Sequence, residues 1–216
     1  MDADRIVFER QLSGAEFRDG AGDEDFSAIL ADYKQHGCAM LVSGDVGIDT
    51  VARAFRLLGG AADADRKRVV LTPSADQNVA SYLPEGVSPS DPDVRVYAGD
   101  EFRTLSGVRD AVFESVVRFD TRESTLRSGQ LRLLAPTAGA LLADVDPQRR
   151  ERFFRSLGTV VRGCRGMGYF HVGTDDVPHG VVDLFDGWIE LREGATGAQQ
   201  RWHVPAGERT TTWMSL

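Results

Sequence analysis

Five short apolar runs, each of five or six residues, recur along the chain and constrain its fold more than any other feature. Each run is too short for a buried helix, and a segment with helical periodicity separates it from the next. Strands joined by helices pair in parallel through right-handed crossovers, and continuous apolar runs are typical of strands buried on both faces. The sequence therefore predicts parallel strands over 38–43, 68–72, 94–98, 131–135 and 168–172.

The segments between these runs predict helices, so the chain is expected to form a three-layer α/β domain. Apolar residues recur there at intervals of three and four, as on the buried face of an amphipathic helix. In the segment 48–58, the residues expected to face inward are Ile48, Val51, Phe55 and Leu58. Further helices are expected over 25–37, 76–83, 106–120 and 147–163, the last with Pro147 in its first turn.

The C-terminal part of the chain has a different pattern. From residue 187 onwards, polar and apolar residues alternate between Gly-containing turns, which predicts antiparallel strands. We therefore expect one domain over 1–216, with a mostly parallel sheet between two helix layers. Residues 1–35 form its N-terminal lead-in, a strand near 6–8 and a helix, and 187–216 form an antiparallel C-terminal extension of the sheet.

The charge balance limits the partners that this chain can have. It carries 33 acidic residues against 25 Lys and Arg, for a net charge of −8, and Lys34 and Lys67 are its two lysines. This composition is typical of a salt-adapted protein, although GC-rich codon usage alone would also produce it. Nucleic acids require clustered positive charge, so no nucleic-acid partner is expected. No apolar run reaches the length of a membrane helix, and the charged start is unlike a signal peptide, so we expect a cytoplasmic protein.

The turn after the first predicted strand stands where a phosphate-binding loop would lie. Such a loop reads GxxxxGK[ST], and its lysine neutralises the phosphates while its hydroxyl binds magnesium. Asp49 falls on the second glycine in one register and on the lysine in the other. Asp in place of the lysine removes an attraction to the phosphates and adds a repulsion, each worth roughly a few kcal/mol. We interpret the turn as the remnant of a nucleotide loop formed by Gly44, Asp45, Gly47, Asp49 and Thr50. Retained weak nucleotide binding is the open alternative.

The end of the fourth predicted strand gives a second test of nucleotide chemistry. RecA-type NTPases carry an Asp there that holds the magnesium shell, and this chain has Ala135, Pro136 and Thr137 instead. The two cysteines, Cys38 and Cys164, are expected to be buried side chains that behave as small apolar groups. We therefore expect neither a metal nor a cofactor, and no catalytic residue.

The second half of the chain contains several motifs that together resemble a known family. They are the Leu141–Leu142 pair before an aromatic-rich helix, then Gly168–His171, Leu184–Asp186, Gln200–His203 and Thr212–Leu216. With them, residues 36–216 resemble an uncharacterised family of halophilic archaea, a degenerate branch of the RecA/KaiC-like ATPase superfamily. Many of its members keep Asp-Ser after the fourth strand, where this chain has Pro136–Thr137. The resemblance implies a RecA-like fold without the Walker A lysine, but no assigned reaction.

Aromatic and arginine side chains in the C-terminal strands are candidates for a protein interface, namely Trp188, Arg201 and Trp213. Because RecA-like proteins assemble side by side, the resemblance implies that Arg201 would face the nucleotide of a neighbouring subunit. Trp202 is expected in the core. His171 is expected to bond to a loop carbonyl, and an acid–base pair with Asp175 or Asp176 is the alternative. The arginine-rich helix over 147–163 is a solvated face balanced by nearby acidic residues, with an interaction surface as the alternative.

These observations favour a non-catalytic RecA/KaiC-like protein, a pseudo-ATPase that acts by protein–protein interaction in regulation or assembly. The partner is a protein of unspecified identity, and a homo-oligomer is an open alternative. The competing hypothesis is a nucleotide-binding or weakly active ATPase or signalling protein with a non-standard phosphate loop. The two differ at the 44–50 turn: side chains that fill the anion site favour the first, and an open nest of amides favours the second.

Overall fold

The computed structural model describes residues 23–75, 78–102, 104–123, 125–173, 181–195, 197–205 and 209–216. The strand expected near residues 6–8 lies outside this part of the chain. The helices are α2 (Asp23–His36), α3 (Ile48–Leu58), η1 (Val79–Tyr82), η2 (Gly99–Glu101), α4 (Leu105–Glu123), α5 (Ala138–Leu141), α6 (Pro147–Gly163) and η4 (Val182–Leu184). The strands are β1 (Cys38–Ser43), β2 (Lys67–Thr72), β3 (Val94–Ala98), β4 (Leu131–Ala135), β5 (Met167–Val172), β6 (Gly187–Gly194), β7 (Gly197–Val204), β8 (Arg209–Thr210) and β9 (Met214–Ser215).

The described strands form one sheet in the order β3-β2-β4-β5-β1-β6-β7-β8, with β9 paired to β7. The five predicted strands, β1 to β5, pair in parallel as expected, for example with Cys38 opposite Met167. β6 also pairs in parallel with β1, so the antiparallel pairing expected from residue 187 begins one strand later, at the β6–β7 hairpin. Alternating polarity identified β6 as a strand but does not indicate which strand lies beside it.

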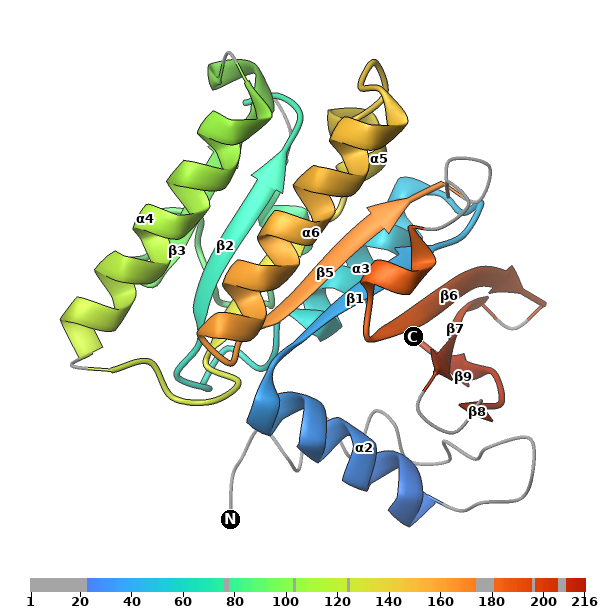
Figure 1. Ribbon diagram of the computed structural model, residues 1–216. Helices are drawn as coiled ribbons and strands as arrows, with labels where there is room; N and C mark the ends of the chain where they lie inside the picture. The colour runs from blue at the N-terminus through green and yellow to red at the C-terminus, as the bar shows by residue number, and fades with distance from the viewer. Residues whose placement is uncertain are drawn as a thin grey trace.

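Helices cover both faces of the sheet, and each face has its own apolar core. In Figure 1, α4 and α6 lie in front of the sheet and α3 lies behind it. Phe55 of α3 and Trp202 of β7 are fully buried in the rear core, which confirms the prediction for Trp202, and Phe119 of α4 is fully buried in the front core. Ile48 was expected to face inward but is 56% exposed. It is the first residue of α3, at the carboxyl edge of the sheet, where the helix has just begun.

The motif at residues 184–186 joins three elements. Phe185 packs with Phe154 of α6 and Phe170 of β5, with ring centroids 5.5 and 5.7 Å away. The carboxylate of Asp186 accepts hydrogen bonds from the backbone N–H of Ala39 at 2.7 Å and from Nε of Arg162 at 2.8 Å. This part of the resemblance therefore reflects packing of β1 against α6.

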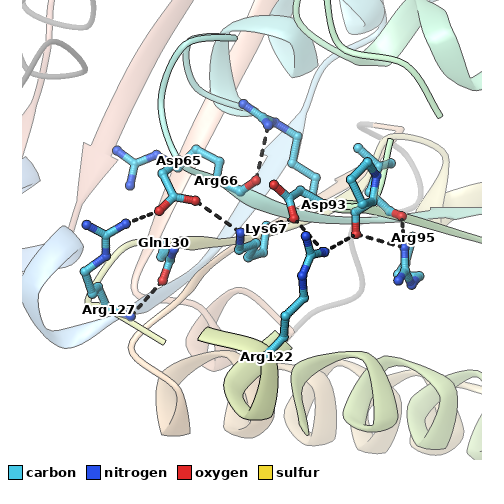
Figure 2. A network of polar contacts seen from close by, with 11 residues as sticks. Asp65, Arg66, Lys67, Asp93, Arg95, Arg122, Arg127 and Gln130 are labelled. Carbon is cyan, nitrogen blue, oxygen red and sulfur yellow. Dashed lines mark hydrogen bonds and ion pairs between the residues drawn. The ribbon is translucent and has the colours of Figure 1, made fainter. Parts of the chain in front are cut away.

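A polar network joins the amino ends of β2 and β3 to the end of α4 (Figure 2). The ammonium of Lys67, a residue only 2% exposed, lies 3.1 Å from carboxylate oxygens of Asp65 and Asp93. Arg127 pairs with Asp65, and Arg122 pairs with Asp93 at 3.1 Å. Burial raises the pKa of Asp65, but hydrogen bonds and nearby positive charge outweigh burial and hold it below its usual value. The network lies opposite the edge where this fold class binds ligands, so it stabilises the sheet.

Candidate functional site

Gly44, Asp45 and Gly47 lie in the turn between β1 and α3, and Asp49 and Thr50 lie in the first turn of α3, at the carboxyl edge of the sheet. Gly47 is the N-cap of α3, in an extended conformation with φ −63° and ψ 156°. Asp45 and Asp49 are exposed, whereas Gly44 and Thr50 are buried. The turn therefore presents two carboxylates to solvent beside the start of a helix.

A third carboxylate, from near the other end of the chain, lies against this turn. Oε1 of Glu193, on β6, accepts a hydrogen bond from the N–H of Gly47 at 3.2 Å and another from the hydroxyl of Thr50 at 3.3 Å. The backbone of β6 is equally close, because a Cβ added to Gly44 would lie 2.4 Å from the carbonyl oxygen of Leu191. Only glycine fits at position 44, and β6 closes the turn on that side.

Glu193 places a negative charge at the start of helix α3. The start of a helix carries a partial positive charge and unpaired N–H groups, which is why phosphates bind there in many α/β proteins. In this chain the carboxylate of Glu193 takes that position. Sequence reasoning missed Glu193, since no spacing links residues 47 and 193. Only the parallel pairing of β6 with β1, with Ser43 opposite Glu190, brings them together.

The end of β4 carries no acidic side chain. Ala135 and Pro136 are buried there, and Thr137 precedes the short helix α5. Within the described ranges, no group of three or more His, Cys, Asp and Glu side chains is placed to hold a metal ion. The buried Cys38 is no nucleophile at neutral pH, because burial raises the pKa of its thiol to about 12. Cys164 is partly buried.

His171 lies at the carboxyl end of β5, between β1 and β4. Burial lowers its pKa below the usual value, and backbone groups of Pro136 and Gly44 partly oppose this shift. The imidazole is therefore neutral at neutral pH. The acidic loop at Asp175 and Asp176, the alternative partner of His171, lies outside the described residues, so that alternative stays untested.

The three predicted interface residues lie on the β6–β7 hairpin and the C-terminal segment that packs on it. The ring of Trp188 stacks on His203 at 4.5 Å between centroids, and its N–H donates to Oγ of Ser43 at 2.6 Å. The guanidinium of Arg201 lies over the ring of Trp213, 4.5 Å from its centroid, and Arg192 lies over the same ring at 3.9 Å. We call the surface formed by Trp188, Arg192, Arg201, His203 and Trp213 the hairpin face. Its tryptophans and Arg201 are half-buried.

The carboxylate of Glu190 lies at the centre of the hairpin face and contacts two of its side chains, Arg201 and His203. Oε2 of Glu190 accepts from Nε of Arg201 at 2.5 Å and lies 2.9 Å from Nε2 of His203, whose Nδ1 contacts Oγ1 of Thr210 at 3.1 Å. Burial raises the pKa of Glu190, but the hydrogen bonds and charges of Arg201 and His203 outweigh burial and lower it overall. The arginine that sequence analysis assigned to a neighbour's nucleotide is thus held within its own chain.

A mostly parallel sheet between two helix layers, closed by an antiparallel hairpin, defines a protein of the KaiC-like RecA fold. The chain belongs to the family of unknown function DUF7504, whose model matches residues 37–191. Among solved structures it is similar to a KaiC-like protein of the hyperthermophilic archaeon Pyrococcus horikoshii OT3, with a TM-score of 0.54 and 10% sequence identity over 79% of each chain. At that identity the likeness shows the fold alone. None of the curated proteins matches the sequence.

No helix within the described part of the chain combines the length and the apolar character that crossing a bilayer requires.

Proposed function

We propose that this protein is a pseudo-ATPase, a non-catalytic member of the KaiC-like RecA fold that acts through contact with other proteins in regulation or assembly. The observation that carries the proposal is the pair of hydrogen bonds that Glu193 accepts from Gly47 and Thr50. They supply the start of α3 with an anion from the chain itself. A triphosphate would have to displace that carboxylate and approach Asp45 and Asp49, with no lysine in the turn to offset the repulsion.

The hairpin face supports the second half of the proposal. Tryptophan and arginine are the residue types that contribute most to the binding energy of protein interfaces. Here Trp188 stacks on His203, and Arg201 lies over the ring of Trp213. These contacts already order the side chains, so the binding of a partner would cost less conformational entropy. We assign this face to a protein partner in the salt-rich cytoplasm that the composition indicates. A second copy of the chain is the alternative partner.

Equilibrium binding of ATP with magnesium tests the pseudo-ATPase assignment. In concentrated salt, we expect a dissociation constant weaker than about 0.1 mM, an affinity below roughly 5.5 kcal/mol, and no ATP or GTP hydrolysis above background. Low-micromolar binding would overturn the proposal. It would support the alternative, a nucleotide-responsive protein or weak ATPase in which Glu193 moves aside and Gly47 and Thr50 bind phosphate.

Cross-linking and pull-down from the native host test the hairpin face. The informative comparison is Trp213→Ala against Phe113→Ala, because Phe113 is an aromatic residue on α4 that is 55% exposed. We expect the Trp213 variant to lose a partner that the wild type and the Phe113 variant both capture. Light scattering measures the molar mass of the same three proteins in solution. If the wild type and the Phe113 variant have the mass of an oligomer and the Trp213 variant has that of a monomer, the partner is a second copy of the chain. Equal capture by all three would contradict the assignment.

A further inference from the structure

A hollow of about 860 Å³ lies on the front face of the sheet, at the carboxyl edge, and is separate from the β1–α3 turn. Its floor includes Pro73, which follows β2, and Gly99, which follows β3, and its walls come from the first turns of α4 and α6 with α5 between them. Figure 1 shows β2 in the space between α4 and α6.

The topology of the sheet explains why a hollow forms at this place. The chain that leaves β2 continues to η1, on the rear face, whereas the chains that leave β3 and β4 continue to α4 and α6 on the front face. The front of β2 therefore has no connection of its own above its carboxyl end. In open α/β sheets, ligands bind where neighbouring connections diverge in this way.

The lining combines apolar surface with guanidinium groups. Half-buried apolar side chains, those of Phe102, Leu105, Leu141 and Val145, line it together with the hydroxyls of Ser106 and Ser156. Its charged members are Arg109, Arg149, Arg152, Asp144 and Asp146. The two aspartates, together with Asp110 that pairs with Arg109, balance the charge of the three arginines, so the lining offers guanidinium donors without an excess of side-chain charge. Two long helices also begin here, and the positive end of each dipole adds about half a charge.

Each arginine of the lining has a partner within the protein but keeps hydrogen-bond donors for a ligand. Nε of Arg149 lies 3.2 Å from a carboxylate oxygen of Asp146, and Nε of Arg152 donates to the carbonyl of Gln148 at 3.3 Å. Arg109 on the facing helix pairs with Asp110 at 2.6 Å. Each contact engages only part of a guanidinium that has five donors in a planar fork, the geometry that suits the oxygens of a phosphate.

We propose that this hollow is a binding site for a phosphate monoester that carries an apolar or aromatic body. The apolar side chains would contact the body, and the arginines of α4 and α6 would bind the phosphate from opposite walls. A phosphate matches this lining better than a carboxylate, because the two helix starts add about one positive charge in total and three guanidiniums with remaining donors suit the three oxygens of a phosphate. The volume falls within the range of small-molecule sites, about 300–1,000 Å³.

Fluorescence titration with 1-naphthyl phosphate tests this site, with inorganic phosphate and 1-naphthol as probes that each lack one half of the ligand. We expect saturable binding of 1-naphthyl phosphate to one site, at least tenfold tighter than either fragment. Arg152→Gln should weaken it about three- to tenfold, through loss of a charged hydrogen bond. The matched control is Arg155→Gln, the same change one turn further along α6, at a residue that pairs with Glu151 and does not line the hollow.

Circular dichroism and a urea titration establish that both variants are folded as the wild type is. Equal affinity of the Arg152 and Arg155 variants would overturn the proposal. So would binding of 1-naphthol as tight as that of 1-naphthyl phosphate, since the hollow would then recognise only an apolar body. Absence of any saturable binding to the folded wild type would overturn it as well.

Discussion

The backbone N–H of Gly47 donates a hydrogen bond to the carboxylate of Glu193 at 3.2 Å, across 146 positions of sequence. This bond joins the start of α3 to the end of β6, one of the two strands that pair with β1. It places an acidic side chain at the start of a helix, a position that favours negative charge and that binds phosphate in many α/β proteins.

Reversing the charge of the turn should create nucleotide affinity. In the double variant Asp49→Lys with Glu193→Gln, a cation replaces an anion and the competing carboxylate is gone, so ATP with magnesium should bind at least tenfold more tightly than to the wild type. The control is Asp63→Lys with Glu193→Gln, which makes the same change of charge at an exposed residue after α3. Isothermal calorimetry measures all three proteins. Equal affinity of the two double variants would show that the turn is not an anion site.

Two glycine substitutions should change stability in opposite directions. Gly44→Ala places a Cβ 2.4 Å from the carbonyl oxygen of Leu191, and this backbone clash should lower the free energy of unfolding by about 1–3 kcal/mol. Gly163→Ala, at the end of α6, meets no atom within 4 Å and should raise it by about 0.5–1 kcal/mol. Urea denaturation measures both. A Gly44 variant as stable as the wild type would mean that β6 is not fixed against the turn.

Glu190→Gln should destabilise the protein in a pH-dependent way. At pH 7 the variant loses two charged contacts in a partly buried site, with Arg201 and His203, which costs about 1–3 kcal/mol. The folded-state pKa of Glu190 is lowered, so the stabilisation is present above the unfolded pKa, about 4.3, and is lost as pH falls through the folded value. The difference in unfolding free energy between the two proteins should therefore shrink below about pH 4. A difference that stays constant down to pH 2 would contradict this assignment.

His171 should make the protein less stable in mild acid. Burial lowers its folded-state pKa, so below the unfolded value of about 6.5 the unfolded chain binds more protons than the folded one. Unfolding free energy should therefore fall as pH decreases from about 6.5, by at most about 1.4 kcal/mol per pH unit for this one group. His171→Gln should flatten that part of the profile, measured by urea denaturation between pH 8 and 5. An unchanged slope in the variant would assign the effect to another residue.

Local pattern was sufficient to predict the parallel core. The run Cys38–Ser43 is apolar almost throughout because both of its faces are covered, and that burial is what the sequence records. The same reasoning was wrong for Ile48, since periodicity indicates which face of a helix turns inward but not where the covering sheet ends. It also missed the parallel pairing of β6 with β1, because alternation shows that one face is buried without naming the neighbouring strand.

The candidate sites depended on contacts between distant parts of the chain. Gly44, Gly47 and Thr50 could be placed at a helix start from local sequence, whereas Glu193 could not, since only the completed sheet brings it there. The hollow above β2 is similar: sequence analysis noted the arginine-rich helix that carries Arg149, but only the fold brings Arg109 of α4 into the lining of the same hollow.

The position of β1 between β5 and β6 has a consequence for biosynthesis. Residues 38–43 are synthesised before both of their strand partners, which follow at 167–172 and 187–194. At about 5–20 residues per second, synthesis of the intervening chain takes on the order of ten seconds. During that interval neither edge of β1 has its final partner, so the completion of the sheet, and with it the contact of Glu193 with the turn, is a late event in synthesis.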